Sequence, residues 1–285
     1  MKSIKITTIT EEVRKLLIKA NFNLPEDVTE AIRNAAREEK SCRAREILEL
    51  ILENAEIASK QKLPLCQDCG LVYIDLDIGR DICIEESGNL SDLLNQTVAE
   101  TYSNNYLRKS VVSDPLYERK NTSGNIPAII HTGFTQDSYL RLKVCLKGGG
   151  SENCSFLYML EPSASEDDII ALILDEVKKN VTKSCPPVII GVGIGGSSSE
   201  VTRLARIASF RNLEVRNSDN RYKRLEEKIL NEVNKTGIGP QGLGGRTTAL
   251  ACNIEHAPCH IASLPLAVFF GCHSTRRADS KISPP

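Results

Sequence analysis

The stretch Leu-Val-Tyr-Ile-Asp-Leu-Asp-Ile, residues 71–78, marks the point where the hydrophobic pattern of the chain changes. From Val72 to Ile78, aliphatic residues occupy every second position, and most residues between them are polar. Because successive side chains of a β-strand point to opposite faces, a period of two predicts a strand with one buried face. The stretch Leu-Arg-Leu-Lys-Val-Cys-Leu, residues 140–146, repeats the pattern and predicts a second strand.

Before this stretch the apolar residues recur at the spacings of a helix, which are three, four and seven. We expect three helices in residues 1–62. Thr10 is expected to cap the first, Pro25 to lie in the first turn of the second, and Ser41 to begin the third.

After the stretch, strands and helices follow one another without a regular βαβ alternation. Further strands are expected at residues 128–134 and 187–193, and further helices at residues 91–106, 169–181, 199–210 and 220–235. Ser165 and Asp168 form a capping-box pattern before the second of these helices. The sequence therefore predicts an α+β fold in one domain, residues 1–285. A helical N-terminal region (residues 1–62) is followed by a mixed α/β body (residues 63–285), with β-sheets flanked by helices.

The composition excludes several classes of protein. Among the 285 residues, 36 Lys and Arg face 37 Asp and Glu, so a net charge of −1 gives no electrostatic reason to bind nucleic acid or anionic lipid. Hydrophobic residues make up 41%, which argues against disorder. No apolar run approaches the roughly 20 residues of a membrane helix. The polar N-terminus lacks a signal-peptide core, and we expect a cytoplasmic protein.

Ten cysteines without an export signal do not indicate a disulfide framework. Each is then a buried small hydrophobe, a reactive thiol or a metal ligand. Cys66, Cys185 and Cys272 lie at predicted element boundaries beside polar groups, and three such thiolates suit a cuboidal iron–sulfur cluster. Four others lie within helical or strand patterns and are expected to be buried: Cys42, Cys83, Cys145 and Cys252. Cys259 is left undecided.

A redox motif and a zinc site are less well supported by the sequence than an iron–sulfur cluster. Cys66 and Cys69 form a C-x-x-C pattern, but a redox motif of this kind should open a helix, whereas a strand begins within three residues. A zinc site would need a second close pair of ligands, and neither Cys259 with His260 nor Cys272 with its neighbour has a spacing suited to joint chelation.

Three glycine-rich loops are candidates for binding an anion. Residues 191–196 satisfy G-x-G-x-x-G, which is typical of a dinucleotide-binding fold if Glu214 contacts a ribose. A less specific interpretation is that the backbone N–H groups of the loop bind any small anion. In the loops 147–153 and 237–248, Lys147 and Arg246 are expected to neutralise substrate carboxylates. Tight turns without a ligand remain the competing interpretation for each loop.

Seven stretches, in this order, give the chain a family resemblance that covers nearly its whole length. They are LCQDCG (65–70), YLRKSVVSDPL (106–116), RKNTSGNIPAIIHTGF (119–134), KGGGSENCS (147–155), CPPVIIGVGIGGSSSEVTRLA (185–205), GIGPQGLGGRTTALA (237–251) and HIASLPLAVFFGCHSTRRA (260–278). The chain resembles the α subunit of two-subunit class I fumarases and L-tartrate dehydratases, the iron–sulfur hydro-lyases.

The resemblance implies that Cys66, Cys185 and Cys272 hold a [4Fe–4S] cluster. Their separations, 119 residues (185 − 66) and 87 residues (272 − 185), look like the spacing in that family. The family motif usually reads CQDTG, and Cys69 stands here at the threonine position. We interpret Cys69 as a neighbour of the cluster and not as a ligand. Cys154 stands where the family often has an apolar residue, which suggests a buried thiol.

The resemblance also implies roles in catalysis. Asp68 and His260 match the active-site aspartate and histidine, which are suggested to manage the proton on the departing or arriving water. Arg108 and Gly149 match positions that contact substrate, with Gln67 beside them, and the charges of Lys147 and Arg246 suggest further contacts. Purely structural roles for the same residues would be a turn residue at Asp68, a core histidine at His260 and an ion pair between Arg108 and a carboxylate such as Asp114.

Single-chain members of the family continue into a second domain that supplies the proton-abstracting base, whereas this sequence ends soon after Cys272. We therefore expect a separate β subunit and an α2β2 heterotetramer. The expected reaction is the reversible hydration of fumarate to L-malate, and the runner-up is the dehydration of L-tartrate to oxaloacetate. A non-catalytic metal- or cluster-binding protein and an NAD-dependent dehydrogenase are hypotheses from different functional classes.

Overall fold

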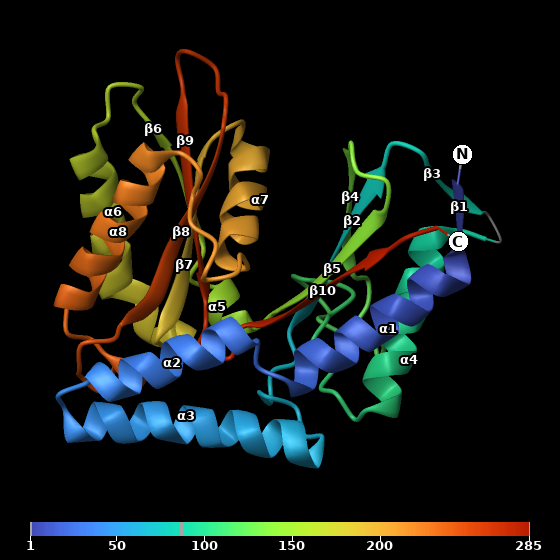
Figure 1. Ribbon diagram of the computed structural model, residues 1–285, viewed down its shortest axis with the longest axis horizontal. Coiled ribbons are helices and arrows are strands. Elements are labelled where there is room, and N and C mark those ends of the chain that lie inside the picture. The colour runs from blue at the N-terminus through green and yellow to red at the C-terminus, as the bar shows by residue number, and fades with distance from the viewer. Residues whose placement is uncertain (1, 86–87, 285) are drawn as a thin grey trace. The chain divides into compact units, whose positions relative to one another are not determined.

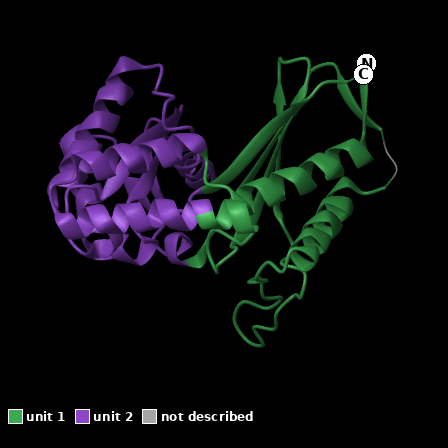
Figure 2. Ribbon diagram, turned by 60° about the horizontal axis from the view of Figure 1, so that its bottom comes forward, with its two compact units in different colours: residues 1–25, 57–149, 276–285 green, residues 26–56, 150–275 purple. Residues whose placement is uncertain are grey.

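The structure is a computed structural model that describes residues 2–85 and 88–284. The chain divides into two compact units (Figure 2). Unit 1 consists of residues 1–25, 57–149 and 276–285, and unit 2 of residues 26–56 and 150–275. Each unit contains helices and a four-stranded sheet, which confirms the predicted α+β fold. Within the described ranges, no helix combines the length and apolar character needed to cross a membrane.

The main sheet of unit 1 has the strand order β10-β5-β2-β4 (Figure 1). Both strands that the alternating pattern predicted are present, and they pair antiparallel as β2 (Leu71–Gly79) and β5 (Leu140–Lys147). The edges are β4 (Ile129–Thr135), parallel to β2, and β10 (Arg276–Ile282), antiparallel to β5. A parallel pair, β1 (Lys2–Lys5) and β3 (Ile82–Glu85), forms a second small sheet.

Two helices, α1 (Ile6–Phe22) and α4 (Leu90–Asn104), complete unit 1. The alternating aliphatic side chains of β2 and β5 form one core with these helices, as the period of two requires. The start of α1 differs from the prediction. The helix begins at Ile6 instead of after Thr10, whose hydroxyl donates to the Thr7 carbonyl oxygen from inside the helix.

In unit 2 the sheet order is β6-β9-β7-β8, in which only β7 and β8 are parallel. The strands are β6 (Phe156–Leu160), β7 (Val188–Gly195), β8 (Ala249–Ala257) and β9 (Leu264–Gly271). Figure 1 shows the sheet between α7 (Ser198–Ser209) on one face and the pair α6 (Glu166–Asn180) and α8 (Asn220–Lys235) on the other. Three short helices lie in the connections: α5 (Gly149–Glu152), η1 (Val181–Ser184) and η2 (Pro240–Gly242).

The helices α2 (Glu26–Glu38) and α3 (Cys42–Gln61) follow unit 1's first helix along the chain. The hydroxyl of Ser41 accepts the Ala44 N–H, as expected of a residue that opens α3. The predicted capping box is confirmed, because Ser165 and Asp168 exchange side-chain and backbone hydrogen bonds at the start of α6. The helix predicted at residues 220–235 has the same bounds in the structure.

The glycines of residues 191–196 allow a helix to pack closely on a strand. A Cβ on Gly191 would lie 2.2 Å from the Ala205 carbonyl oxygen, and one on Gly193 would lie 2.2 Å from the Val201 carbonyl oxygen. Both acceptor residues belong to α7, so only glycine lets α7 sit this near β7. The motif thus has a structural role that requires no dinucleotide.

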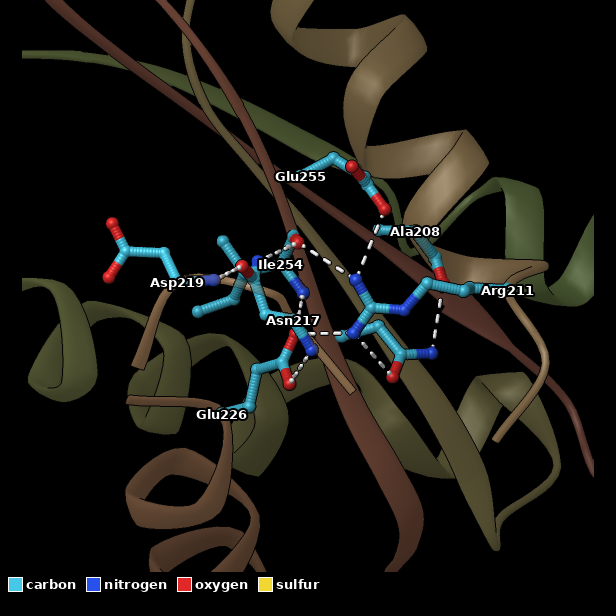
Figure 3. Close-up of polar contacts among 8 residues, drawn as sticks. Ala208, Arg211, Asn217, Asp219, Glu226, Ile254 and Glu255 are labelled. Carbon is cyan, nitrogen blue, oxygen red and sulfur yellow. Dashed lines mark hydrogen bonds and ion pairs between the residues drawn. The ribbon is translucent and has the colours of Figure 1, made fainter. Parts of the chain in front are cut away.

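A buried polar network holds the chain between α7 and α8 (Figure 3). Arg211 donates to the buried Glu226 carboxylate, to Asn253 Oδ1 at 3.1 Å and to the Ile254 carbonyl oxygen at 3.0 Å. Asn217 donates to the same Ile254 oxygen at 2.9 Å. The segment around Glu214 is therefore an anchored loop, and the second strand that a dinucleotide fold would place there is not formed.

The cysteine burial predicted from local patterns is only half correct. Cys145 and Cys252 are buried, as is Cys154, but Cys42 and Cys83 are exposed. Cys42 is the first residue of α3 and lies off its buried stripe, and Cys83 lies on the two-stranded sheet. Both cysteines lie in segments with a periodic apolar pattern, but neither is on the face of its helix or strand that is buried. Cys259 is also exposed.

Candidate active site

The turn of residues 65–70 precedes β2 in unit 1 and carries three of the predicted site residues. The Leu65 N–H donates to the Asn21 carbonyl oxygen at 2.9 Å, and the buried Tyr102 hydroxyl donates to the Cys69 carbonyl oxygen at 3.0 Å. Gly70 has a φ of +76°, and a Cβ there would lie 2.6 Å from the Lys147 carbonyl oxygen, so the position requires glycine. These contacts fix the turn at both ends.

The Asp68 carboxylate is held by two backbone N–H groups. Its Oδ1 accepts the Gly70 N–H at 3.1 Å, and its Oδ2 accepts the Gly149 N–H at 2.6 Å. Asp68 and Gly149 are 81 residues apart in the sequence, and the structure brings them into direct contact. Two backbone donors thus set the orientation of a half-buried carboxylate.

Arg108 is positioned through its backbone. Its N–H donates to the Cys69 sulfur at 3.2 Å, and the neighbouring Ser110 N–H donates to Asn125 Oδ1 at 2.7 Å. Asn125 in turn donates to the Gly70 carbonyl oxygen at 3.0 Å, which ties this segment to the turn. The Arg108 side chain is exposed, and in the described part of the chain it makes no ion pair, with Asp114 or any other carboxylate.

Cys69, in the same turn, is buried. Burial raises the pKa of the Cys69 thiol, and the opposing effects of the Arg108 N–H and the Arg276 charge do not cancel it. The sulfur is already an acceptor for a backbone N–H. Cys66, by contrast, is half-buried, and its thiol lies 3.7 Å from Gln67 Oε1. Lys147, at the end of β5, is only 1% exposed.

In unit 2 the structure brings the Cys185 and Cys272 segments together. Cys185 is exposed, has a φ of +53° and separates η1 from β7. Cys272 is half-buried after β9, and the next residue, His273, donates its N–H to the Cys185 carbonyl oxygen at 3.3 Å. Gln241 adds a third segment, because its backbone N–H and its Nε2 both donate to the Pro186 carbonyl oxygen at 2.8 Å.

His260 lies in the exposed β8–β9 connection, within a turn that bonds to itself. The Ser263 N–H donates to the His260 carbonyl oxygen at 2.9 Å, and the Ala262 N–H donates to His260 Nδ1 at 3.1 Å. Because a nitrogen that accepts an N–H carries no proton, the neutral ring has its proton on Nε2. Nε2 is therefore the proton-carrying atom that the turn presents.

Arg246 lines a surface groove of about 700 Å³ in unit 2. The groove also includes Glu38, Glu39, Asn231, Asn234, Lys235, Gly237, Gly245 and Thr247. The Arg246 N–H donates to the buried Glu39 carboxylate at 2.8 Å. Burial alone would raise the pKa of Glu39, but backbone N–H donors from Ser41, Arg246, Lys40 and Thr247 lower it below its usual value. Glu39 thus fixes the backbone of this loop.

The three predicted cluster ligands are divided between the units, with Cys66 in unit 1 and Cys185 and Cys272 in unit 2. None of the three is in a disulfide, and none is buried, in contrast to Cys69, Cys145, Cys154 and Cys252. Across residues 2–85 and 88–284, no group of three or more His, Cys, Asp or Glu side chains is gathered closely enough to hold a metal ion. The donor set itself fits an iron–sulfur cluster, because accessible thiolates are the ligands that such clusters take.

The profile of the fumarate hydratase (Fumerase) family matches residues 10–281. This chain belongs to that family. The match confirms the resemblance drawn from the sequence motifs, and membership makes the chain a hydro-lyase.

Three relatives can be compared with this chain by sequence identity and by the share of each chain that the match covers. A protein of Methanocaldococcus jannaschii, provisionally named L(+)-tartrate dehydratase subunit alpha, is 36% identical over 96% of this chain and 97% of its own length. The L(+)-tartrate dehydratase subunit alpha of Escherichia coli K12 is 27% identical over 95% of this chain and 90% of its own. A provisional class I fumarate hydratase of Geobacillus stearothermophilus is 31% identical over 96% of this chain but only 55% of its own length.

Several positioning residues were missed in the sequence, among them Tyr102, Asn125 and Gln241. Each acts through one or two hydrogen bonds to a backbone group far away in the chain. Asn125 and Gln241 lie within the stretches that carry the family resemblance, which was their only signal. Tyr102 had none, because an aromatic residue on a helix is normally a core residue.

Proposed function

We propose that this chain is the α subunit of a [4Fe–4S]-dependent hydro-lyase that acts on a four-carbon dicarboxylate together with a separate β subunit. The reaction proposed first is the hydration of fumarate to L-malate. The observation that carries the proposal is the Asp68–Gly149 contact, because it joins two predicted site residues from distant motifs in a family of hydro-lyases. The dehydration of L-tartrate is the second candidate, supported by the names of the relatives from M. jannaschii and E. coli.

Hydration breaks an O–H bond of water, adds its oxygen to C2 and places a proton on C3. We assign Asp68 as the group that accepts the proton leaving the water, and the support for this is that the Gly70 and Gly149 N–H groups hold its carboxylate. In the reverse direction the protonated Asp68 returns that proton to the departing hydroxide, and the Nε2–H of His260 donates a hydrogen bond to the same oxygen. The exposed guanidinium of Arg108, with Gln67 nearby in the turn, is suited to a substrate carboxylate. The contacts proposed for Lys147 and Arg246 stay predictions.

Cys66, Cys185 and Cys272 are the residues proposed to hold the cluster. When bound, such a group supplies an electrophilic iron that polarises a carbon–oxygen bond. The chain's own residues supply orientation. Cys66 is two residues from Asp68 in the turn of residues 65–70, so a ligand at Cys66 would bring the cluster's chemistry close to the carboxylate that handles the proton.

The partner is proposed from the relatives. Two of them are named as alpha subunits, and the class I fumarate hydratase relative is nearly twice as long as its match to this chain. We therefore propose that a β subunit supplies the base that acts at C3 and that the assembly is α2β2. The cytoplasmic location and the single-domain organisation expected from the sequence also stay predictions.

The test is coexpression with the β subunit under strict anaerobiosis, followed by assays with fumarate, L-malate and L-tartrate. Serine at Cys66, Cys185 or Cys272 should remove bound iron and activity together, while Cys42→Ser, at an exposed thiol, should leave both unchanged. A colourless protein that carries zinc, or full iron content in a variant of one proposed ligand, would overturn the cofactor assignment. Turnover of tartrate at a much higher kcat/KM than fumarate would select the second candidate.

One further variant distinguishes the proposed enzyme from a non-catalytic cluster-binding protein. Asp68→Asn keeps the size of the side chain but replaces an oxygen that accepts an N–H by an amide that cannot accept as a carboxylate does. We expect hydro-lyase activity to fall at least about 10²-fold with the iron content unchanged. Equal activity in the two proteins would favour a role for Asp68 in the turn alone.

A further inference from the structure

Arg276 is a buried cation that the proposed mechanism does not use. It is the first residue of β10 and is only 1% exposed, among the largest fully buried side chains of the chain. Placing a guanidinium in the interior is costly unless its charge and its donors meet partners. The surroundings of Arg276 therefore indicate what it is for.

The guanidinium lies directly behind the Asp68 turn. Its Nη1 donates to the Asp68 carbonyl oxygen at 2.6 Å, across 208 residues of sequence. Its Nη2 and Asp68 Oδ2 both face Gly148, because a Cβ on Gly148 would lie 3.4 Å from the former and 3.1 Å from the latter. The Arg276 Nε has no hydrogen-bond partner among the described residues. Among the described residues Arg276 makes no ion pair, so its hydrogen bond to the Asp68 carbonyl oxygen is its principal polar contact.

The contacts around Asp68 form a closed set within unit 1. The backbone carbonyl oxygen of Asp68 is held from behind by Arg276, and its carboxylate is held in front by the Gly70 and Gly149 N–H groups. If the carbonyl contact is lost, the turn can rotate, and the carboxylate leaves both N–H donors. A position two residues away, Cys66, would move with it.

We propose that Arg276 is the positioning residue of this site: it fixes the backbone of Asp68, and with it the direction of the carboxylate and the Cys66 turn. The inference rests on the proposed function, in which Asp68 handles a proton. A lysine can give one hydrogen bond to the carbonyl oxygen but has no planar fork to reach past Gly148, so Arg276→Lys should rescue only part of the effect.

The first test uses the full apo chain and measures the order of the site directly, without an activity assay. Hydrogen exchange of the Gly70 and Gly149 amides is measured by NMR in the wild type, Arg276→Met and Arg276→Lys. We expect both amides to exchange at least about tenfold faster in Arg276→Met, with an intermediate result in Arg276→Lys, while amides in the middle of β2 stay protected. The matched control is Arg206→Met, which removes another buried arginine, on α7 in unit 2.

The second test uses the complex with the β subunit. Arg276→Met should lower kcat roughly 10- to 100-fold with a smaller change in KM, because a displaced Asp68 affects the reacting geometry more than substrate binding. Gly148→Ala should act in the same direction, since its Cβ would press between Asp68 Oδ2 and Arg276 Nη2. This variant keeps the test decisive if Arg276→Met does not fold.

Unchanged exchange at Gly70 and Gly149 in Arg276→Met, or a loss of kcat no larger than that of Arg206→Met, would overturn the positioning role. Failure of the proposed function looks different. If the wild-type complex hydrates or dehydrates none of the diacids, the activity assignment falls, whereas faster exchange at Gly70 and Gly149 would still show that Arg276 holds Asp68.

Discussion

At the scale of single residues, hydrogen bonds from the backbone decide which atoms of the site can take part in chemistry. Asp68 presents a carboxylate whose two oxygens each accept one N–H, and His260 presents Nε2 because Nδ1 accepts the Ala262 N–H. In both cases the donor is a backbone N–H and not an ionisable side chain. The Asp68 turn also receives a hydrogen bond from Arg276 to its carbonyl oxygen, so its position depends on that side chain as well.

The His260 arrangement predicts a tautomer and a loss of activity. In the neutral ring, the ¹⁵N resonances should show Nε2 protonated and Nδ1 unprotonated. His260→Gln removes the ring Nε2–H that donates to the oxygen of the departing hydroxide and should lower kcat by roughly 10²- to 10³-fold. His256→Gln is the matched control, because His256 is an exposed histidine on β8 that packs on Tyr222 with ring centroids 4.1 Å apart. An Nδ1–H tautomer, or equal losses in both variants, would contradict the assignment.

At the scale of elements, the positions of helices and loops depend on a few close contacts. The helix α7 packs on glycines of β7, and the loop after η2 is held by the carboxylate of Glu39, the residue that follows α2. In both cases one side chain, or its absence, sets the position of a whole segment. Each case gives a prediction about stability.

Gly191→Ala should separate α7 from β7. Its Cβ would lie 2.2 Å from backbone atoms of Ala205 and Ser209, so the helix itself must move. We expect the free energy of unfolding to fall by at least about 2 kcal/mol in urea titrations. Gly149→Ala is the control for stability, because its Cβ would meet only Asp68 Oδ2 at an ordinary 3.6 Å. Equal stabilities of the two variants would contradict the packing role.

Glu39 predicts a pH dependence of stability. Because the pKa of Glu39 is lower in the folded chain than in the unfolded chain, its contribution is present above the unfolded pKa and is lost as pH falls through the folded one. Glu39→Gln should cost about 1–3 kcal/mol at neutral pH, because one of the two carboxylate oxygens that accept backbone N–H groups is replaced by an NH2 donor. The difference from the wild type should shrink as pH falls below about 4.3, the usual value for a glutamate. A difference that is constant from pH 7 to pH 3 would refute this account.

At the scale of the whole molecule, the ten cysteines divide into an accessible set and a buried set. Cys42, Cys66, Cys83, Cys185, Cys259 and Cys272 are exposed or half-buried, and Cys69, Cys145, Cys154 and Cys252 are buried. Burial also raises the pKa of the Cys69 and Cys252 thiols, which lowers their fraction of reactive thiolate. The two sets should therefore differ in reactivity.

A thiol reagent should modify the six accessible cysteines of the native apo chain and all ten after unfolding, as counted by mass spectrometry. Loading the cluster should then protect three of the six, namely Cys66, Cys185 and Cys272, and leave Cys42, Cys83 and Cys259 reactive. Protection of Cys69 alone by added iron and sulfide, or of none of the three proposed ligands, would contradict the assignment.

Local patterns predicted the elements whose burial has a clear period. These patterns predicted the strands near residues 71–78 and 140–146, the capping box at Ser165 and the helix of residues 220–235. The strand β10 was not predicted, because Arg276, Arg277 and Asp279 give it no apolar alternation. It is a strand only because it pairs with β5, across at least 130 residues of sequence (276 − 146).

By itself, then, the sequence determined the α+β class, the family and the residues of the Asp68 and His260 motifs, because each of these is carried by short contiguous stretches. Only the tertiary structure decided which cysteines are covered, why residues 191–196 are rich in glycine, and that Arg276 lies behind Asp68. These depend on segments distant in the sequence that meet in the fold. The alternation of a strand says that one face is buried, but not what covers it, and a charged residue in a motif does not show its partner.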